Sequence, residues 1–284
     1  AQRTRSRRIR SEAFVDSATG EITPGSRPTT PIPTPDELKL DFTERYWHSL
    51  EWTNTSWLGS LVQRPPADMI AYQEMVTRVR PAWIVETGTG TGGRALFLAS
   101  ICDLIGHGQV LSIDATPAED RPTHDRITYL AADPLADDTI ERVGEIVGPE
   151  PDALVILGYD TMERLVAASA GYAELVPDGT YLDIEATMTG GHPVWNGMGP
   201  GPNQALRTIV KETSDFVADR HMEQFGTTYN PTGFLRRLSG RERKRREPLH
   251  RRSAQAEGAA ASAISSVQPV AHRLLARARQ AVPR

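Results

Sequence analysis

Apolar and polar positions through the middle of the chain follow two spacings, one typical of strands and one typical of helices. Short runs rich in Val, Ile and Leu are followed by longer stretches in which apolar residues recur every three or four positions. The short runs predict strands at 82–86, 109–113, 127–131, 152–157, 179–184, roughly 225–229 and 233–238. The longer stretches predict helices at 92–105, 136–147, 161–175 and 203–212. This alternation predicts an α/β fold with a Rossmann-like, doubly wound and mostly parallel sheet, covered by helices on both faces.

The segments around this core differ from it in composition. Residues 1–37 are polar and contain five prolines, which predicts a flexible N-terminal arm. Residues 38–81 have helical spacing and many aromatic residues; they fit a lid over a site or, as the favoured alternative, a helical layer packed on the sheet. A core domain is expected at 82–239, followed by a basic, Ala/Ser-rich tail at 240–284. The tail ends in an amphipathic stretch, 270–281, which fits a contact in a homo-oligomer or a loosely attached helix.

Charge is unevenly distributed over a chain whose net charge is −4. The first twelve residues carry five Arg and one Glu, and residues 240–284 carry eleven Lys or Arg and three Glu, which leaves 13–239 at −16. An acidic body is not typical of enzymes that bind nucleic acid, so no nucleic-acid partner is expected. The basic run at 241–246 fits a solvated tail better than a contact with nucleic acid or anionic lipid.

Apolar runs and cysteine usage bear on the compartment. No stretch of about 18 apolar residues is present, so no membrane insertion is expected. The arginine-rich start lacks the apolar run of a signal peptide, and the single cysteine, Cys102, excludes an internal disulfide. These features predict a cytoplasmic protein.

A glycine-rich turn between the first core strand and its helix is the main candidate for ligand binding. An apolar run ends in Glu86, and Gly88, Gly90, Gly92 and Gly93 follow before the helix. Glycines allow the backbone to approach a ligand closely, and a helix N-terminus presents unpaired N–H groups. This pattern predicts a nucleotide-binding turn.

The charges around the turn favour S-adenosylmethionine over NAD as the ligand. Asp114 closes the next strand, where an acid suits the two hydroxyls of a ribose in either cofactor. The spacing from Gly88 is G-x-G-x-G-G, however, and not the G-x-G-x-x-G of a dinucleotide site. Glu86 would attract a cationic sulfonium and ammonium and would repel a pyrophosphate.

Several separated blocks, in order over about residues 50–238, resemble the cephalosporin hydroxylase-like/rhamnosyl O-methyltransferase family. The general methyltransferase part of the match is at 85–88, 92–93 and 111–114, and further blocks are at 54–59, 72–74, 191–194, 199–202 and 229–237. General methyltransferases lack the last three blocks, 191–194, 199–202 and 229–237. The resemblance implies the methyltransferase type of sheet, with an antiparallel seventh strand. It also implies a family that binds S-adenosylmethionine and releases S-adenosylhomocysteine, and in which several members methylate hydroxyls of sugars or other secondary metabolites with bound Mg²⁺.

The resemblance also assigns a cofactor site. Glu86 and Gly88, with Gly92 and Gly93 in the same block, stand where the family contacts the amino-acid end and sulfonium of the cofactor. Asp114 would bind the ribose, and Asp133 falls where the family contacts adenine. Arg94 is unusual, because the family normally has a small Ser at this position. Ordinary polar residues at strand ends are the alternative for these acids.

The family's metal site is not matched by the sequence. Members end the fourth strand with Leu-Asp and the fifth with Glu-Asp-Thr, but here the fourth ends in Gly158 and the fifth is followed by Ala186. Glu185 is the one carboxylate left, and Mg²⁺ requires several oxygen ligands. No metal is therefore expected.

A general base for methyl transfer must come from elsewhere. The family's His after the fourth strand is Thr161 here. His192, in a retained Gly-His-Pro-Val block, is the favoured base because histidine titrates near neutral pH, although a structural role fits it equally well. Asp160 is a displaced candidate, with a solvated loop acid as the alternative, and Glu185 completes the candidate catalytic set.

Three functions remain open. The favoured one is a metal-independent O-methyltransferase acting on a small secondary metabolite, for example in antibiotic biosynthesis. The second is an enzyme that keeps the cofactor pocket but catalyses a cyclisation, elimination or rearrangement. The third is a non-catalytic cofactor-binding partner protein, against which the intact glycine turn and Asp114 argue.

Overall fold

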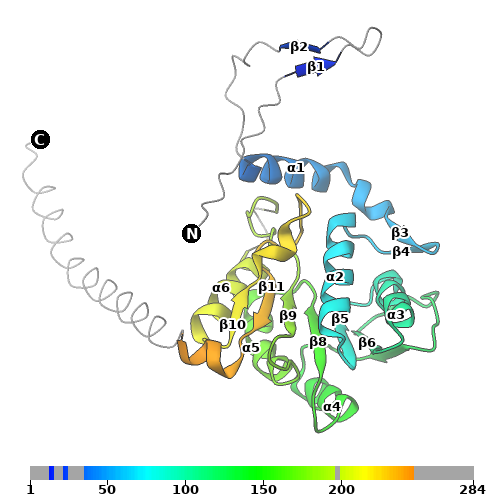
Figure 1. Cartoon of the computed structure of the whole chain (residues 1–284). Coiled ribbons are helices and arrows are strands. Elements are labelled where there is room, and N and C mark those ends of the chain that lie inside the picture. Colours follow the sequence, from blue (N-terminus) through cyan, green and yellow to red (C-terminus); the bar gives the residue numbers. More distant parts are fainter. Residues whose placement is uncertain (1–12, 16–21, 25–34, 196–198, 246–284) are drawn as a thin grey trace, which may run out of the picture. The chain divides into compact units, whose positions relative to one another are not determined.

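The structure of the protein is a computed structural model that describes residues 13–15, 22–24, 35–195 and 199–245 (Figure 1). The chain divides into two compact units, Ala1–Lys39 and Leu40–Arg284. The expected arm and tail lie largely outside the described residues, so their character stays a prediction. None of the described helices is both long enough and apolar enough to cross a membrane.

The first unit contains a short antiparallel pair, β1 (Ala13–Val15) and β2 (Ile22–Pro24). Helix α1 (Pro35–Ser49) spans the division between the units.

The second unit is built on a seven-stranded sheet in the order β10-β11-β9-β8-β5-β6-β7. Its strands are β5 (Trp83–Thr87), β6 (Gln109–Asp114), β7 (Ile127–Ala131), β8 (Ala153–Leu157), β9 (Tyr181–Ile184), β10 (Phe216–Ala218) and β11 (Phe234–Arg237). β5, β6, β7, β8 and β9 pair in parallel, whereas β11 runs antiparallel to both β9 and β10. The predicted Rossmann-like sheet with an antiparallel last strand is confirmed.

Helices cover both faces of this sheet, because successive side chains of its strands point to opposite sides. Ile84 and Val85 in β5 belong to two different apolar clusters, and Leu154 and Val155 in β8 alternate in the same way. One cluster packs against α4 (Asp137–Val147), α5 (Met162–Ala173) and α6 (Pro202–Glu212), and the other against α2 (Pro66–Val79) and α3 (Gly93–Ile105) (Figure 1). Burial on both faces explains why these strands read as continuous apolar runs.

The segment before α2 supplies shorter elements. The 3₁₀ helix η1 (Glu51–Asn54) leads into a small antiparallel pair, β3 (Ser56–Trp57) and β4 (Ser60–Leu61). A second 3₁₀ helix, η2 (Arg220–Glu223), lies between β10 and β11.

The strand expected at 225–229 is wrong. The sixth strand is β10, at Phe216–Ala218, and 225–229 is a connection in which Gly226 has φ +92°. The apolar pattern there has another cause: Phe225 packs against the cluster under α2 and α3, while Tyr229 packs in an aromatic cluster. β10 could not be predicted from the sequence, because it has only three residues and only Phe216 among them is buried.

Candidate active site

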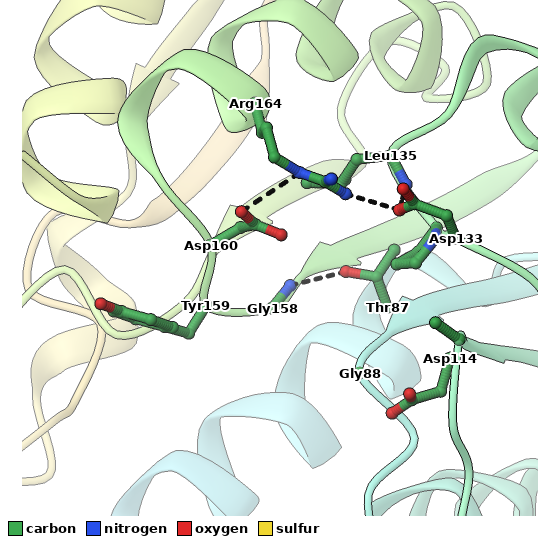
Figure 2. Close-up of a pocket in the computed structure, with 11 residues that line it drawn as sticks. Thr87, Gly88, Asp114, Asp133, Leu135, Gly158, Tyr159, Asp160 and Arg164 are labelled. Atoms are coloured by element: carbon green, nitrogen blue, oxygen red, sulfur yellow. Dashed lines mark hydrogen bonds and ion pairs between the residues drawn. The ribbon is translucent and has the colours of Figure 1, made fainter.

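A pocket of about 410 Å³ opens at the carboxyl ends of β5, β6, β7 and β8. Its wall is formed by Thr87, Gly88, Asp114, Ala115, Asp133, Pro134, Leu135, Gly158, Tyr159, Asp160 and Arg164 (Figure 2). Ligands of open α/β sheets bind in the crevice outside the carboxyl ends of the strands. The pocket is therefore where the fold itself favours a ligand.

The four glycines of the first loop have two different roles. Gly88 (φ +81°) and Gly90 (φ +52°) adopt left-handed backbone, and a Cβ on either would meet nothing within 4 Å. Gly93 instead packs on β4, because a Cβ there would lie 2.0 Å from the Leu61 carbonyl oxygen. Gly92 faces Pro122, again with no room for a side chain. The first two glycines leave open space, and the last two fix the loop against its neighbours.

Asp114 holds the first loop and the start of the next one. Its carboxylate accepts hydrogen bonds from the backbone N–H groups of Gly90 (3.1 Å) and Thr116 (2.9 Å). The side chain still lines the pocket, where Figure 2 shows it close to Gly88. A carboxylate has about four lone-pair positions, so these two bonds leave capacity for a ligand hydroxyl.

An arginine bridges two acids on the other side of the pocket. Arg164 donates to Asp133 (2.5 Å) and lies 3.3 Å from Asp160, as Figure 2 shows. Asp133 also accepts the Leu135 N–H, and the bond from Arg164 together with this bond lowers the pKa of Asp133. All three side chains are partly exposed, so water weakens this bridge, and it remains able to rearrange around a ligand.

Directly behind the pocket lies a buried charged cluster. Arg94 bonds to Glu86 and to Glu185, which come from the ends of β5 and β9, and donates to the carbonyl oxygens of Thr87 (3.0 Å) and Gly88 (3.3 Å). The Arg94, Glu86 and Glu185 side chains are at most 5% exposed. Arg94 thus ties the first loop to the sheet from inside.

Helix α2 and the residues before it complete this cluster. Arg64 binds both oxygens of Glu185, at 3.1 and 3.0 Å. The Tyr72 hydroxyl lies 2.9 Å from Glu185 and 2.7 Å from Asp183. The cluster therefore joins residues that are up to 121 positions apart in sequence.

The pKa values of two acids in the cluster, Glu185 and Asp183, are shifted in opposite directions. Burial disfavours the charged form of Glu185, but Arg64 and Arg94 outweigh it and lower its pKa to about 2. Asp183 is also fully buried and stands beside Glu185, so its pKa is raised well above the usual range. Burial raises the pKa of Asp68, whose carboxylate accepts the Tyr229 N–H, to about 7.

An aromatic cluster adjoins the pocket through Tyr159. The Tyr159 ring meets Trp195 edge to face, with 5.7 Å between centroids, and Trp195 meets Trp47 in the same way at 4.9 Å. Trp47 stacks on Trp52, and Tyr229 contacts both. Tyr159 and Trp195 are exposed. They offer ring faces or edges to a molecule bound next to the pocket.

Comparison with known proteins decides the family. The model of the family described as Rhamnosyl O-methyltransferase/CmcI matches residues 49–238. The chain belongs to this family. The Rhamnosyl O-methyltransferase of Mycobacterium bovis (strain BCG / Pasteur 1173P2) is 31% identical over 211 residues, which are 70% of this chain and 85% of that protein. Its namesake from Mycobacterium leprae (strain TN) is 29% identical over 210 residues, 70% of this chain and 90% of the relative.

Solved structures agree on the fold. A CmcI structure described as Mg-SAM has a TM-score of 0.54 at 19% identity, covering 80% of this chain and 91% of that one. A CmcI apo-structure has a TM-score of 0.53 at 18% identity, covering 81% and 91%. The family match confirms the expectation that this chain is an S-adenosylmethionine-dependent methyltransferase.

The residues that the family resemblance assigned to the cofactor fall into two groups. Gly88, Asp114 and Asp133 line the pocket. Glu86 does not: its carboxylate is fully buried and accepts hydrogen bonds from Arg94 and, at 2.6 Å, from Ser112. Gly92 and Gly93 serve the packing of the loop, as described above. Cofactor contacts of any of the six stay a prediction.

The three candidate catalytic residues are not brought together. Asp160 lines the pocket. Glu185 is held by two arginines and has a lowered pKa, so it is unsuited to accept a proton near neutral pH. His192 is half-buried after the turns that follow β9 and is not among the residues of the pocket wall.

The family's magnesium position can be tested against these residues. Gly158 has no oxygen side chain, and a Cβ there would lie 2.6 Å from the Thr87 carbonyl oxygen. Ala186 offers none either, and Glu185 is bound by Arg64 and Arg94. Within the described part of the chain, no three His, Cys, Asp or Glu side chains are grouped so as to hold a metal. The residues at this position do not fit Mg²⁺.

Several residues of the site were not found from the sequence. Tyr159 and Arg164 line the pocket, and Arg64, Tyr72 and Asp183 build the cluster behind it. Arg94 carried a signal, since a large cation replaced a small residue beside the glycine loop. Its partner Glu185 is 91 residues away, so the sequence alone did not indicate the contact.

Proposed function

We propose that the protein transfers the methyl group of S-adenosylmethionine to a hydroxyl of a small secondary metabolite, a sugar or a related molecule, without a divalent metal. The observation that carries the proposal is the pocket. Gly88, Asp114 and Asp133 line it from the ends of three neighbouring strands, in a family whose relatives are named rhamnosyl O-methyltransferases.

The cofactor would lie along these strand ends. Asp114 would accept hydrogen bonds from the ribose hydroxyls, for which its carboxylate has free lone pairs. Pro134 and Leu135 give an apolar wall next to Asp133, which suits the face of adenine. The methyl group would then lie towards Gly158 and Tyr159, which are the pocket residues that follow β8.

When bound, S-adenosylmethionine would supply an electrophilic methyl group: the acceptor oxygen would bond to the methyl carbon as the carbon–sulfur bond breaks and its electron pair passes to sulfur. The hydroxyl proton leaves to a base or to water. Alignment of the three atoms supplies much of the rate enhancement, and a positioned base contributes about 10²–10⁴-fold. Asp160 is the favoured base because it lines the pocket, although Arg164 must release it. His192 remains the alternative, since it lies in the family-specific block that follows β9.

Metal independence is supported by the donor set. A divalent ion beside Glu185 would have to displace two arginines from the same carboxylate, and neither Gly158 nor Ala186 supplies a second oxygen. Mg²⁺ binds in near-ideal octahedral geometry, which this set of residues does not support.

The acceptor would bind over Tyr159 and Trp195. Exposed aromatic rings next to a pocket suit a molecule with an apolar face, such as a sugar ring or an aromatic ring. The acceptor would then lie beside the end of β8, on the side of the pocket where the methyl group is expected.

The experiment is a turnover assay with candidate hydroxyl acceptors, in which S-adenosylhomocysteine and the methylated product are measured together. Equal amounts of both, unchanged by EDTA, are expected. Turnover that stops with EDTA and returns with Mg²⁺ would disprove metal independence, while the methyltransferase function would stand.

A second function deserves the same assay, because Glu86 is neutralised by Arg94 and is not free to attract a sulfonium. In this alternative, the protein uses its pocket for a cyclisation, elimination or rearrangement. Product formation without release of S-adenosylhomocysteine, and equally fast with S-adenosylhomocysteine as cofactor, would favour it. A protein that binds cofactor and turns over no substrate would fit the third function, a non-catalytic partner.

A further inference from the structure

The buried arginine behind the pocket uses the groups that would otherwise receive the cationic end of the cofactor. Its Nε donates to Glu86, and its two terminal nitrogens donate to Glu185 and to the carbonyl oxygens of Thr87 and Gly88. Four of the five N–H groups of Arg94 are thereby engaged. Thr87 and Gly88 belong to the pocket wall, so Arg94 contacts the backbone of two residues that line the pocket.

Arg94 also removes the negative charge at this end of the pocket. Glu86 and Glu185 carry two negative charges, and Arg64 and Arg94 carry two positive ones, so the four side chains are neutral together. With a small neutral residue at position 94, the same site would have a net charge of −1 and would attract a sulfonium or ammonium group. The 5% exposure of the Arg94 side chain prevents water from screening its effect on Glu86.

The opposite end of the pocket keeps its recognition groups. Asp114 lines the pocket, and no arginine in the described part of the chain forms an ion pair with it; its two bonds are to backbone N–H groups of the neighbouring loops. Pro134 and Leu135 remain available to pack against the adenine ring of the cofactor.

We propose that Arg94 is a specificity-determining residue that makes this pocket bind its cofactor through the nucleoside and nearly independently of the charge at the amino-acid end. The inference rests on the proposed function, since it concerns how S-adenosylmethionine is held. It separates this chain from a site in which a free strand-end acid selects the charged methyl donor over its neutral product.

The test is a calorimetric titration of the full chain with three ligands: S-adenosylmethionine, S-adenosylhomocysteine and 5′-methylthioadenosine, which lacks the amino-acid end. Dissociation constants within about tenfold of one another are expected. A preference of 100-fold or more for S-adenosylmethionine over methylthioadenosine would overturn the inference.

Two variants add a matched comparison. Arg94→Ser frees Glu86, while Glu185 keeps Arg64, and it should raise the preference for S-adenosylmethionine over S-adenosylhomocysteine about tenfold. Arg94→Lys keeps the positive charge beside Glu86 and should keep the native ratio of the two dissociation constants, while making fewer hydrogen bonds than arginine. An unchanged preference in folded Arg94→Ser would also overturn the inference, and if this variant does not fold, the three-ligand comparison on the native chain decides alone.

Failure of the two proposals gives different results. If none of the three ligands binds, both fall. If all three bind equally but no methyl group is transferred to any acceptor, the proposed function falls and the role of Arg94 stands.

Discussion

Replacing Asp114 by alanine tests the cofactor site most directly. The carboxylate is expected to bind the ribose hydroxyls through charge-assisted hydrogen bonds, each of which contributes more than a neutral one. Loss of this contact should cost about 1.5–3 kcal/mol of binding free energy. That corresponds to a dissociation constant for S-adenosylmethionine that is roughly 10- to 150-fold higher.

The structure shows why alanine alone is ambiguous. Asp114 also accepts the N–H groups of Gly90 and Thr116, so its removal loosens the glycine loop in addition to removing a ligand contact. Gly90 and Thr116 donate to different oxygens of Asp114, so Asp114→Asn keeps an acceptor for one of the two N–H groups and loses the charge. It should fall between the native protein and Asp114→Ala.

The assay is calorimetric titration with S-adenosylhomocysteine and S-adenosylmethionine, accompanied by thermal unfolding to show that each variant is folded. Glu119→Ala, an acid on the connection after β6, is a suitable control. If Asp114→Ala binds both ligands with native affinity, the assignment of the ribose site to the end of β6 is refuted.

Three further expectations concern pH, metal binding and the acceptor. Burial raises the pKa of Asp68 to about 7, so its contribution to stability is complete below the usual value of 3.8 and is lost as pH rises to about 7. Between pH 4 and pH 8, the free energy of unfolding of Asp68→Asn in urea should therefore rise by up to about 4 kcal/mol relative to that of the native protein. A difference between the two proteins that does not change with pH would contradict this. Gly158→Asp should destabilise the protein by about 1–3 kcal/mol, and Mg²⁺ should not change the melting temperature of this variant. Gly144→Asp is the control, because a Cβ at Gly144 meets nothing within 4 Å and should not show the steric cost. A rise in the melting temperature of Gly158→Asp with Mg²⁺ would disprove the steric argument. Trp195→Ala should raise KM for the acceptor about 3- to 10-fold without changing cofactor affinity, with the exposed Leu104→Ala as control; an unchanged KM would remove Trp195 from the acceptor site.

The fold could be predicted from the sequence wherever a strand is buried on both faces. β5, β6, β8 and β9 are rich in buried Val, Ile and Leu, which surface segments are not, and their limits agree with the predicted ones within one or two residues. β10 failed this test, because only one of its three side chains is buried and its place in the sheet comes from pairing with β11.

The site could be predicted only where its residues follow strand ends. Gly88, Asp114 and Asp133 do so, and parallel strands bring their carboxyl ends to one edge. Arg64 and Arg94 could not be assigned partners, since each reaches Glu185 across 121 or 91 residues of sequence and no periodicity encodes such a pairing. Tertiary packing determines these contacts, and with them the charge of the pocket's rear wall.

The close approach of Gly93 to the Leu61 carbonyl has a consequence for how this protein can be divided or recombined. The Thr91 hydroxyl donates to that same carbonyl at 2.6 Å, so the β3–β4 pair, which precedes the core strands in sequence, supports the conformation of the glycine loop. A fragment that begins at β5 would keep every residue of the glycine loop but lose the β4 backbone against which the loop packs. Chimaeras between relatives should therefore exchange residues 55–62 and 88–93 together, because each segment packs against the other and would not fit the corresponding segment of a different relative.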